Sequence, residues 1–178
     1  MQGLVNIASY IGYCISVLLP TVCYLAALGL FLYGAWGFWV QAQPDNPYRH
    51  RPWVPALSLV LCGVFASFDR FLTMANGSAG TNLNVSIAAL TSYTPPQTGG
   101  NVLGNTPGDT VVNVVTLFLG FFQPFGAFAC LWAVLAWWST VNGRSNRSQM
   151  SCLVQFIFGV MLMNISTITN FLVQEFNA

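Results

Sequence analysis

Residues 11–40, IGYCISVLLPTVCYLAALGLFLYGAWGFWV, contain no charged side chain and decide the fold. A helix from Ile11 to Val40 is long enough to cross the hydrocarbon core of a bilayer, which is about 30 Å thick. Pro20 can bend this helix near its start, because proline removes one hydrogen bond from the helical ladder. The stretch therefore predicts a transmembrane helix.

Three further stretches are similarly apolar, from Trp53 to Met74, from Val112 to Thr140 and from Met150 to Val173. Each exceeds the length at which an apolar stretch is read as a membrane span. In lipid the backbone must be hydrogen-bonded within helices or a closed barrel, and these stretches lack the alternation of barrel strands. The predicted fold class is all-α, an integral membrane helical bundle of about four transmembrane helices forming two hairpins.

The composition supports the same class. Only 5% of the 178 residues are charged and 55% are hydrophobic, whereas soluble domains carry about 25% charged residues. There is no lysine and no basic patch that could hold a phosphate backbone, so we expect no nucleic-acid binding. The five cysteines are spread along the chain without CxxC spacing. This pattern favours small buried residues over a disulfide framework or a metal site.

The chain divides into three parts. Residues 1–74 are expected to form an N-terminal helix and the first transmembrane hairpin, and residues 112–178 the second hairpin. Residues 75–111 form an extracytoplasmic polar loop, rich in the Asn, Gly and Pro that signal turns. Within it, Leu83 to Leu90 could form a short amphipathic piece. A solvated spacer and a surface that contacts partners both fit this loop.

The first segment, Met1 to Ser16, predicts an interfacial helix that leads into the first span. Ala8, Gly12 and Ser16 are spaced four residues apart, so these small residues share one helical face. Small residues in membrane helices allow close approach of a neighbouring helix. We therefore expect this face to pack against another helix of the bundle.

Four of the five arginines lie in two short turns, at 41–52 and 141–149. They are Arg49, Arg51, Arg144 and Arg147. The positive-inside rule assigns both turns to the cytoplasm and leaves both termini outside it. Five of the six tryptophans flank these turns, as an interfacial belt does. They are Trp36, Trp39, Trp53, Trp137 and Trp138.

The two halves share weak sequence features. Pro20 and Pro124 open the first span of each half, and Gly-Val pairs at 63–64 and 159–160 occur in the second. An ancient duplication and coincidence both explain the match, because small residues recur in any membrane bundle.

Polar residues inside the predicted spans are the next candidates. Asp69 and Arg70 lie near the outer end of the second span, where interfacial anchoring and a role in a pore or charge site are both open. Asn164, Thr167 and Asn170 recur at near-helical spacing in the last span. Such a stripe can contact a neighbouring helix or line a pore.

Catalytic motifs are missing from the sequence. The single histidine, His50, stands between two arginines with no carboxylate nearby in the sequence, and no HExxH, GxSxG or phosphate-cradling glycine loop occurs. We expect no enzymatic activity, no cofactor and no metal site.

The last third of the chain, FFQPFGAFACLWAVLAWWSTVNGRSNRSQMSCLVQFIFGVMLMNISTITNFL, resembles the IcmC/DotE/TraQ-type small membrane proteins of type IVB secretion and IncI-type conjugation systems. Gln123, Gly126 and Gly159 match that pattern, as does the pair Asn164-Ile165. The opening helix LLPTVCYLAALGLFLYGAWGFW is also similar, whereas the middle loop is unmatched and the turns use arginine without lysine.

The resemblance implies a structural subunit of a conjugative transfer or type IV secretion apparatus in the bacterial inner membrane. Such a subunit would act by helix packing and oligomeric assembly, as a homo-oligomer and with other membrane subunits of the apparatus, surrounded by lipids. Two alternatives remain open. One is a pilin-like subunit of an extracellular conjugative filament, and the other is a small membrane channel or transporter.

Overall fold

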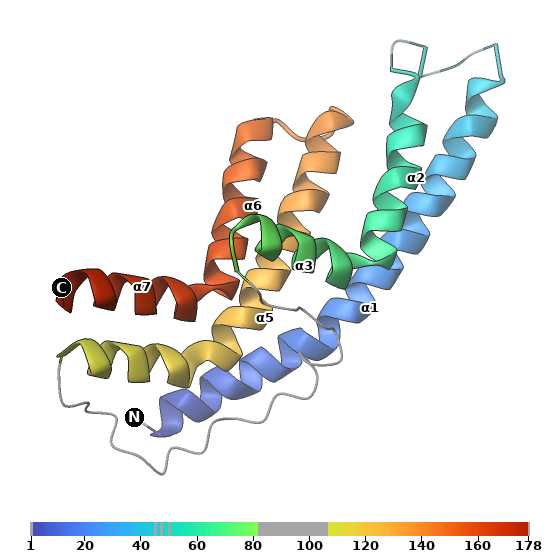
Figure 1. Ribbon diagram of the computed structural model, residues 1–178. Coiled ribbons are helices and arrows are strands. Elements are labelled where there is room, and N and C mark those ends of the chain that lie inside the picture. Colours follow the sequence, from blue (N-terminus) through green and yellow to red (C-terminus); the bar gives the residue numbers. More distant parts are fainter. Residues whose placement is uncertain (1, 45, 47, 50, 82–106, 178) are drawn as a thin grey trace.

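The structure is a computed structural model. It describes the chain except for residues 1, 45, 47, 50, 82–106 and 178. The described residues form helices and turns and contain no strand, which confirms the all-α class for this part of the chain. The helices, labelled as in Figure 1, are α1 (Gln2–Gln41), α2 (Trp53–Ala66), α3 (Phe68–Ser78), α5 (Pro107–Val141), α6 (Gln149–Met163) and α7 (Ile165–Asn177).

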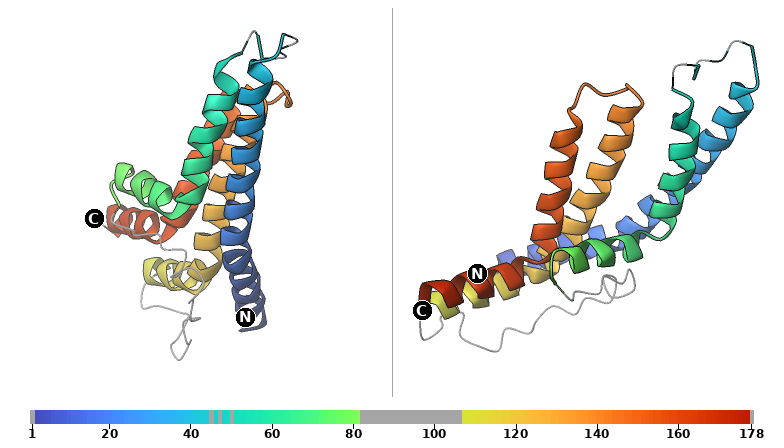
Figure 2. Two further views of the ribbon diagram at one scale, coloured as in Figure 1. Left: turned by 90° about the vertical axis from the view of Figure 1, so that its right-hand side faces the viewer. Right: turned by 45° about the horizontal axis from the view of Figure 1, so that its top comes forward.

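Two helical hairpins stand side by side. α1 pairs with α2, α5 pairs with α6, and the hairpins meet through α1 and α5. Both hairpin turns lie at the same end of the molecule (Figure 2). At the other end α3, α7 and the first part of α5 lie crosswise to the hairpins, forming a layer from which the hairpins rise (Figure 2).

The second and fourth predicted helices are not straight. The segment expected from Trp53 to Met74 bends by 85° between α2 and α3, and the one expected from Met150 to Val173 bends by 74° between α6 and α7. Ser67 and Asn164 stand at these bends, and each side chain donates to the backbone carbonyl four residues earlier. Side chains that bond to the backbone in this way compete with the helical ladder.

These bends limit the number of spans that length and composition support. α1 and α5 are each long and apolar enough to cross a membrane, and the count rises to four if each bent pair is one span. α2 and α6 alone, with 14 and 15 residues, reach only about 21–23 Å at the helical rise of 1.5 Å per residue. Neither covers a hydrocarbon core of about 30 Å without its bent partner.

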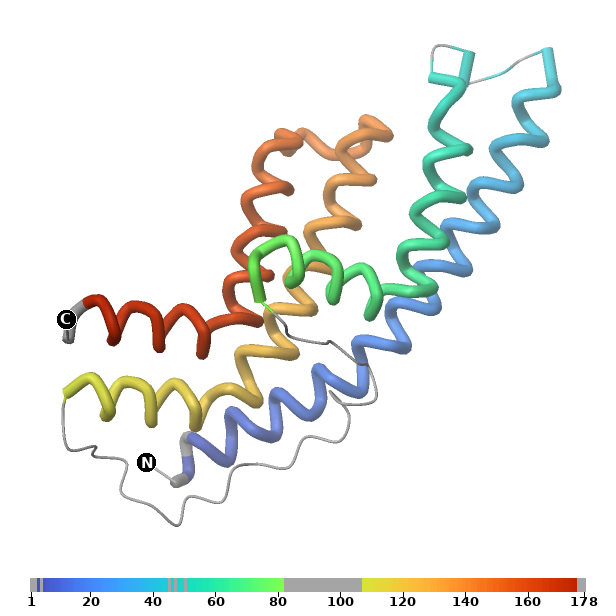
Figure 3. The backbone as a smooth tube through the Cα atoms, in the orientation of Figure 1, coloured from blue at the N-terminus to red at the C-terminus, as the bar shows by residue number. Residues whose placement is uncertain are grey.

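The N-terminal segment is not a separate helix. α1 runs without interruption from Gln2 to Gln41 and includes Pro20, so the expected interfacial segment and the first span form one helix. α5 changes direction along its length (Figure 3) and contains Pro124. Proline at this position leaves the carbonyl of Gly120 without its helical donor, which accounts for a bend here.

The core lies where the hairpins meet. Leu19, Cys23, Ala27 and Leu30 recur every three or four residues, so α1 presents one buried apolar face. This face belongs to a single cluster with buried residues of the other helices. They are Leu61, Phe65, Phe68, Leu72, Ala127, Cys130, Leu131, Val160 and Met163.

Candidate functional site at the basic end of the hairpins

The two arginine-bearing turns contact each other. The guanidinium of Arg51 donates to the carbonyl of Val141, with 3.4 Å between Nη1 and the oxygen. Gly143 adopts a φ of +74°, and a Cβ at this position would stand 2.9 Å from the same Nη1. Both the left-handed backbone and the close approach of Arg51 favour glycine here. The contact joins the tips of the two hairpins.

An aromatic cluster, formed by Tyr33, Trp36, Tyr48 and Trp138, lies beneath the turns. The guanidinium of Arg144 stands 5.3 Å from the ring centre of Tyr33 and 5.9 Å from that of Trp138. These distances are those of cation–π contacts. The Trp138 indole also donates to the Ser58 hydroxyl over 3.3 Å, which ties α5 to α2.

Tyr48 is tied into this cluster by its phenol. Its hydroxyl donates to that of Tyr33 over 3.0 Å, and the two rings meet edge to face. Partial burial and this hydrogen bond raise the pKa of Tyr48 to about 12, although the positive charge of Arg144 acts in the opposite direction. The phenol therefore stays protonated well beyond its ordinary range of about pH 10.

The other residues predicted for this end are exposed or half-buried. The side chains of Arg49 and Arg147 are exposed, as are those of Trp39 and Trp53. Trp137 is half-buried, and its neighbour Trp138 belongs to the aromatic cluster. His50 lies outside the described residues. All four arginines are exposed, but among the described residues only Arg51 and Arg144 make side-chain contacts that join the hairpins.

The predicted small residues lie at two helix contacts, one between α1 and α5 and one between α5 and α6. A Cβ on Gly12 would overlap the carbonyl oxygen of Gly120, so α1 and α5 touch backbone to backbone there. Of its companions, Ser16 is buried and donates to its own helix, and Ala8 is half-buried. A Cβ on Gly159 would stand 2.9 Å from the carbonyl oxygen of Gly126, so α5 and α6 also approach closely through their backbones.

A buried amide pair was missed by the sequence prediction. Asn76 lies in the last turn of α3, and its side-chain oxygen accepts a hydrogen bond from the side-chain amide of Asn164 over 2.8 Å. The sequence predicts that Asn76 belongs to the polar loop of residues 75–111, because that segment is rich in Asn, Gly and Pro. No local signal could have found it, since its partner is 88 residues away.

Asp69 and Arg70 do not join this pair. They occupy the first turn of α3, opposite the end that holds Asn76, and the Asp69 carboxylate accepts from the backbone N–H of Arg70 over 2.8 Å. Thr167 and Asn170, the other members of the predicted polar stripe, are exposed on α7. The predicted piece from Leu83 to Leu90 lies outside the described residues.

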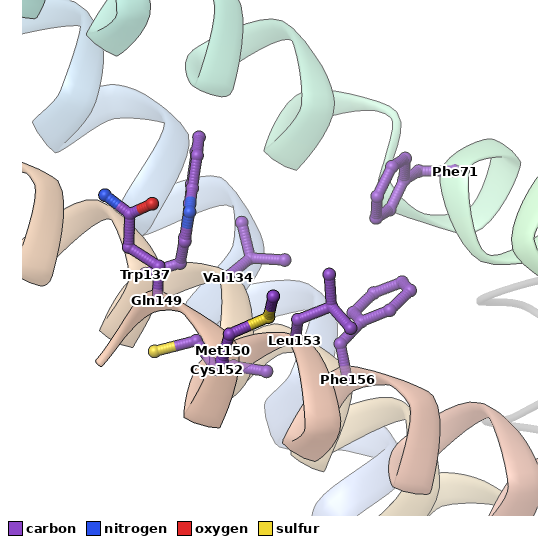
Figure 4. Close-up of a pocket in the computed structure, with 9 residues that line it drawn as sticks. Phe71, Val134, Trp137, Gln149, Met150, Cys152, Leu153 and Phe156 are labelled. Atoms are coloured by element: carbon purple, nitrogen blue, oxygen red, sulfur yellow. The ribbon is translucent and has the colours of Figure 1, made fainter. Parts of the chain in front are cut away.

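An apolar groove lies between the hairpins (Figure 4). Its volume is about 450 Å³, and its walls come from α5 and α6, with Phe71 of α3 facing them. Its nine lining residues are mainly apolar; the strongest polar groups are the amide of Gln149, the first residue of α6, and the indole N–H of Trp137. The groove therefore runs from the basic end toward the crosswise layer.

Groups of three or more His, Cys, Asp or Glu side chains that could hold a metal do not occur within the part of the chain that the structure describes. The five cysteines are free thiols. No protein-family model, curated protein or solved structure matches this chain.

Proposed function

We propose that this chain is a non-enzymatic structural subunit of a membrane-embedded assembly, and that it acts by helix packing with other chains and with copies of itself. The observation that carries the proposal is the outward face of α2. Ala56, Val60 and Gly63 share one side of this helix and are exposed, as is Ser67, which follows its last residue. A Cβ added to Gly63 would meet nothing within 4 Å.

The equivalent glycine of the other hairpin supports this interpretation. Gly63 and Gly159 are each the eleventh residue of their helices, α2 and α6. Gly159 allows α6 to lie against the backbone of Gly126, whereas a Cβ on Gly63 would meet no described residue within 4 Å. Glycine in a helix interior costs about 1 kcal/mol relative to alanine. The exposed small residues Ala56 and Gly63 offer a second helix the close approach that membrane helices use to associate.

The same proposal includes a multi-pass arrangement in the bacterial inner membrane. The joined basic turns would face the cytoplasm, since arginine-rich turns are retained on that side. Both termini and the crosswise layer of α3 and α7 would then lie at the outer face. Support comes from four arginines at one end of the hairpins and from the two helices that are long and apolar enough to cross.

The particular assembly we propose is a conjugative transfer or type IV secretion apparatus. Its support is the resemblance of the chain to the IcmC/DotE/TraQ-type proteins. Deleting the gene should then abolish DNA or protein transfer between cells while leaving solute uptake intact. Normal transfer by the deletion strain would refute the transfer role and leave the assembly role to be judged by the next experiment.

The assembly role is tested by Gly63→Leu in the full-length chain in lipid nanodiscs. The substitution leaves the packing within the chain intact because no neighbour stands at this position. We expect it to shift the native mass from an oligomer to the single chain. The matched control is Gly29→Leu on α1, where an added Cβ also meets nothing, and this variant should keep the wild-type mass. A wild-type chain that is already monomeric, or a Gly63→Leu variant that stays oligomeric, would refute the proposal.

A further inference from the structure

The groove between the hairpins has two chemically different ends. At one end the rings of Phe71 and Phe156 stand 5.6 Å apart and join α3 to α6. At the other end lie Gln149 and Met150, the first two residues of α6. Figure 4 shows Leu153 and Val134 between these ends. The groove is therefore apolar along its length and polar at the end nearest the basic turns.

The size and lining of the groove fit a flexible apolar chain. Its volume of about 450 Å³ falls in the range of about 300–1,000 Å³ that small-molecule sites occupy. Apart from the Gln149 amide, the Trp137 indole N–H and the weakly polar Cys152 thiol, the lining is apolar, so it offers few hydrogen bonds to a polar ligand. Half of the Leu153 side chain is exposed, which leaves the groove open toward the surroundings of the hairpin.

The polar end of the groove lies next to positively charged groups. Arg147 precedes the N-cap Ser148 of α6, and its guanidinium makes no hydrogen bond or ion pair with any residue that the structure describes. Arg144 lies in the same turn, against the aromatic cluster. The N-terminus of α6 adds partial positive charge. Of the four acids, only Asp45 belongs to the hairpin turns.

We propose that the groove binds an anionic phospholipid, with one acyl chain along α6 and the phosphate held by Arg147. Basic pockets between membrane helices at the cytoplasmic side are suited to anionic headgroups. Guanidinium and phosphate form strong, charge-assisted hydrogen bonds. This inference rests on the membrane embedding proposed above and is independent of the assembly role, because the face of α2 that carries Gly63 does not line the groove.

A photo-crosslinking amino acid at position 153 identifies the occupant. The full-length chain is labelled in bilayers of phosphatidylcholine with a minor fraction of phosphatidylglycerol, and the adduct is weighed. We expect an adduct with the mass of one phosphatidylglycerol, far above its share of the bilayer. Adducts in proportion to bilayer composition would mean non-selective lipid contact only. An adduct of twice the chain mass would mean that a second copy fills the groove. Either result would overturn the proposal.

The headgroup contact is tested by Arg147→Gln. Loss of a charge-assisted contact should reduce phosphatidylglycerol adducts about tenfold, while phosphatidylcholine adducts persist. Arg70→Gln is the matched control, because it removes the same charge from exposed α3 and should leave the selectivity unchanged. A second variant, Val134→Phe, narrows the groove and should reduce both adducts. Unchanged selectivity in a correctly folded Arg147→Gln variant would refute the headgroup assignment.

Discussion

The side-chain amide of Asn164 donates a hydrogen bond to the side-chain oxygen of Asn76, with 2.8 Å between the two atoms. Both residues are buried, and the same Asn164 amide also donates to the carbonyl of Val160 at the end of α6. The bond joins the last turn of α3 to the junction of α6 and α7. It therefore connects the bent second arms of the two hairpins.

Removing one side of this pair should destabilise the fold. Asn76→Leu removes the buried side-chain oxygen to which the Asn164 amide donates. We expect this loss to lower the free energy of unfolding by about 1–3 kcal/mol. Asn76 Nδ2 and Asn164 Oδ1 already have no partner in the described part of the chain. The double variant Asn76→Leu with Asn164→Leu should therefore cost less than the sum of the single variants. Denaturant unfolding in micelles measures these free energies.

The exposed Asn170 of α7 provides the control for the amide pair. Asn170→Leu should change the free energy of unfolding by less than about 0.5 kcal/mol, as surface substitutions usually do. If the two single variants at the buried pair behaved like this control, the hydrogen bond would contribute nothing to holding the hairpin arms together.

The paired glycines of the two hairpins should respond differently to alanine. A Cβ at Gly159 would lie 2.6 Å from the Cys130 sulfur and 2.9 Å from the Gly126 carbonyl oxygen, so α5 and α6 must move apart. Overpacking of this kind costs about 1–3 kcal/mol. Gly63→Ala meets nothing within the chain and should be neutral or slightly stabilising. Equal melting temperatures for the two variants would contradict the close approach of α5 and α6.

Much of the helical content could be predicted from the sequence, because α1 and α5 are uninterrupted apolar stretches. The bends at Ser67 and Asn164 could not. A hydropathy pattern is the same for a straight and a bent helix, and the bends accompany single hydrogen bonds from these side chains to Gly63 and Val160. The sequence therefore predicts four spanning helices, where the structure has two long helices and two bent pairs.

The candidate sites could also be predicted only in part from the sequence. The spacing of Ala8, Gly12 and Ser16 predicts a face for close packing, but the partner at Gly120 is known only from the fold, because it lies more than 100 residues away. The sequence predicts that the arginines of the two turns lie at the same end of the bundle, because each turn connects the two helices of a hairpin. That Arg51 and Arg144, rather than Arg49 and Arg147, contact the neighbouring hairpin depends on how the hairpin tips meet.

Alkaline pH should loosen the basic end through Tyr48. The fold raises the pKa of Tyr48 from 10.0 to about 12, so it favours the protonated phenol more than the unfolded chain does. This stabilisation is complete below about pH 10 and is lost as the pH rises through about 12. Ultraviolet titration of tyrosinate should show a late-titrating component that Tyr48→Phe removes. Titration of all tyrosines near pH 10 would contradict the hydrogen bond to Tyr33.

Membrane orientation is tested by labelling single cysteines with an impermeant maleimide on intact cells. Ala42→Cys and Asn146→Cys place exposed thiols in the two turns without removing an arginine, and Ser78→Cys places one at the end of α3. With the arginine-rich turns in the cytoplasm, only the cysteine at 78 should react before permeabilisation, and all three should react after it. The wild-type chain corrects for its own five cysteines. Labelling of the turn positions on intact cells, with position 78 protected, would reverse the arrangement and move the basic end of the lipid groove to the outer face.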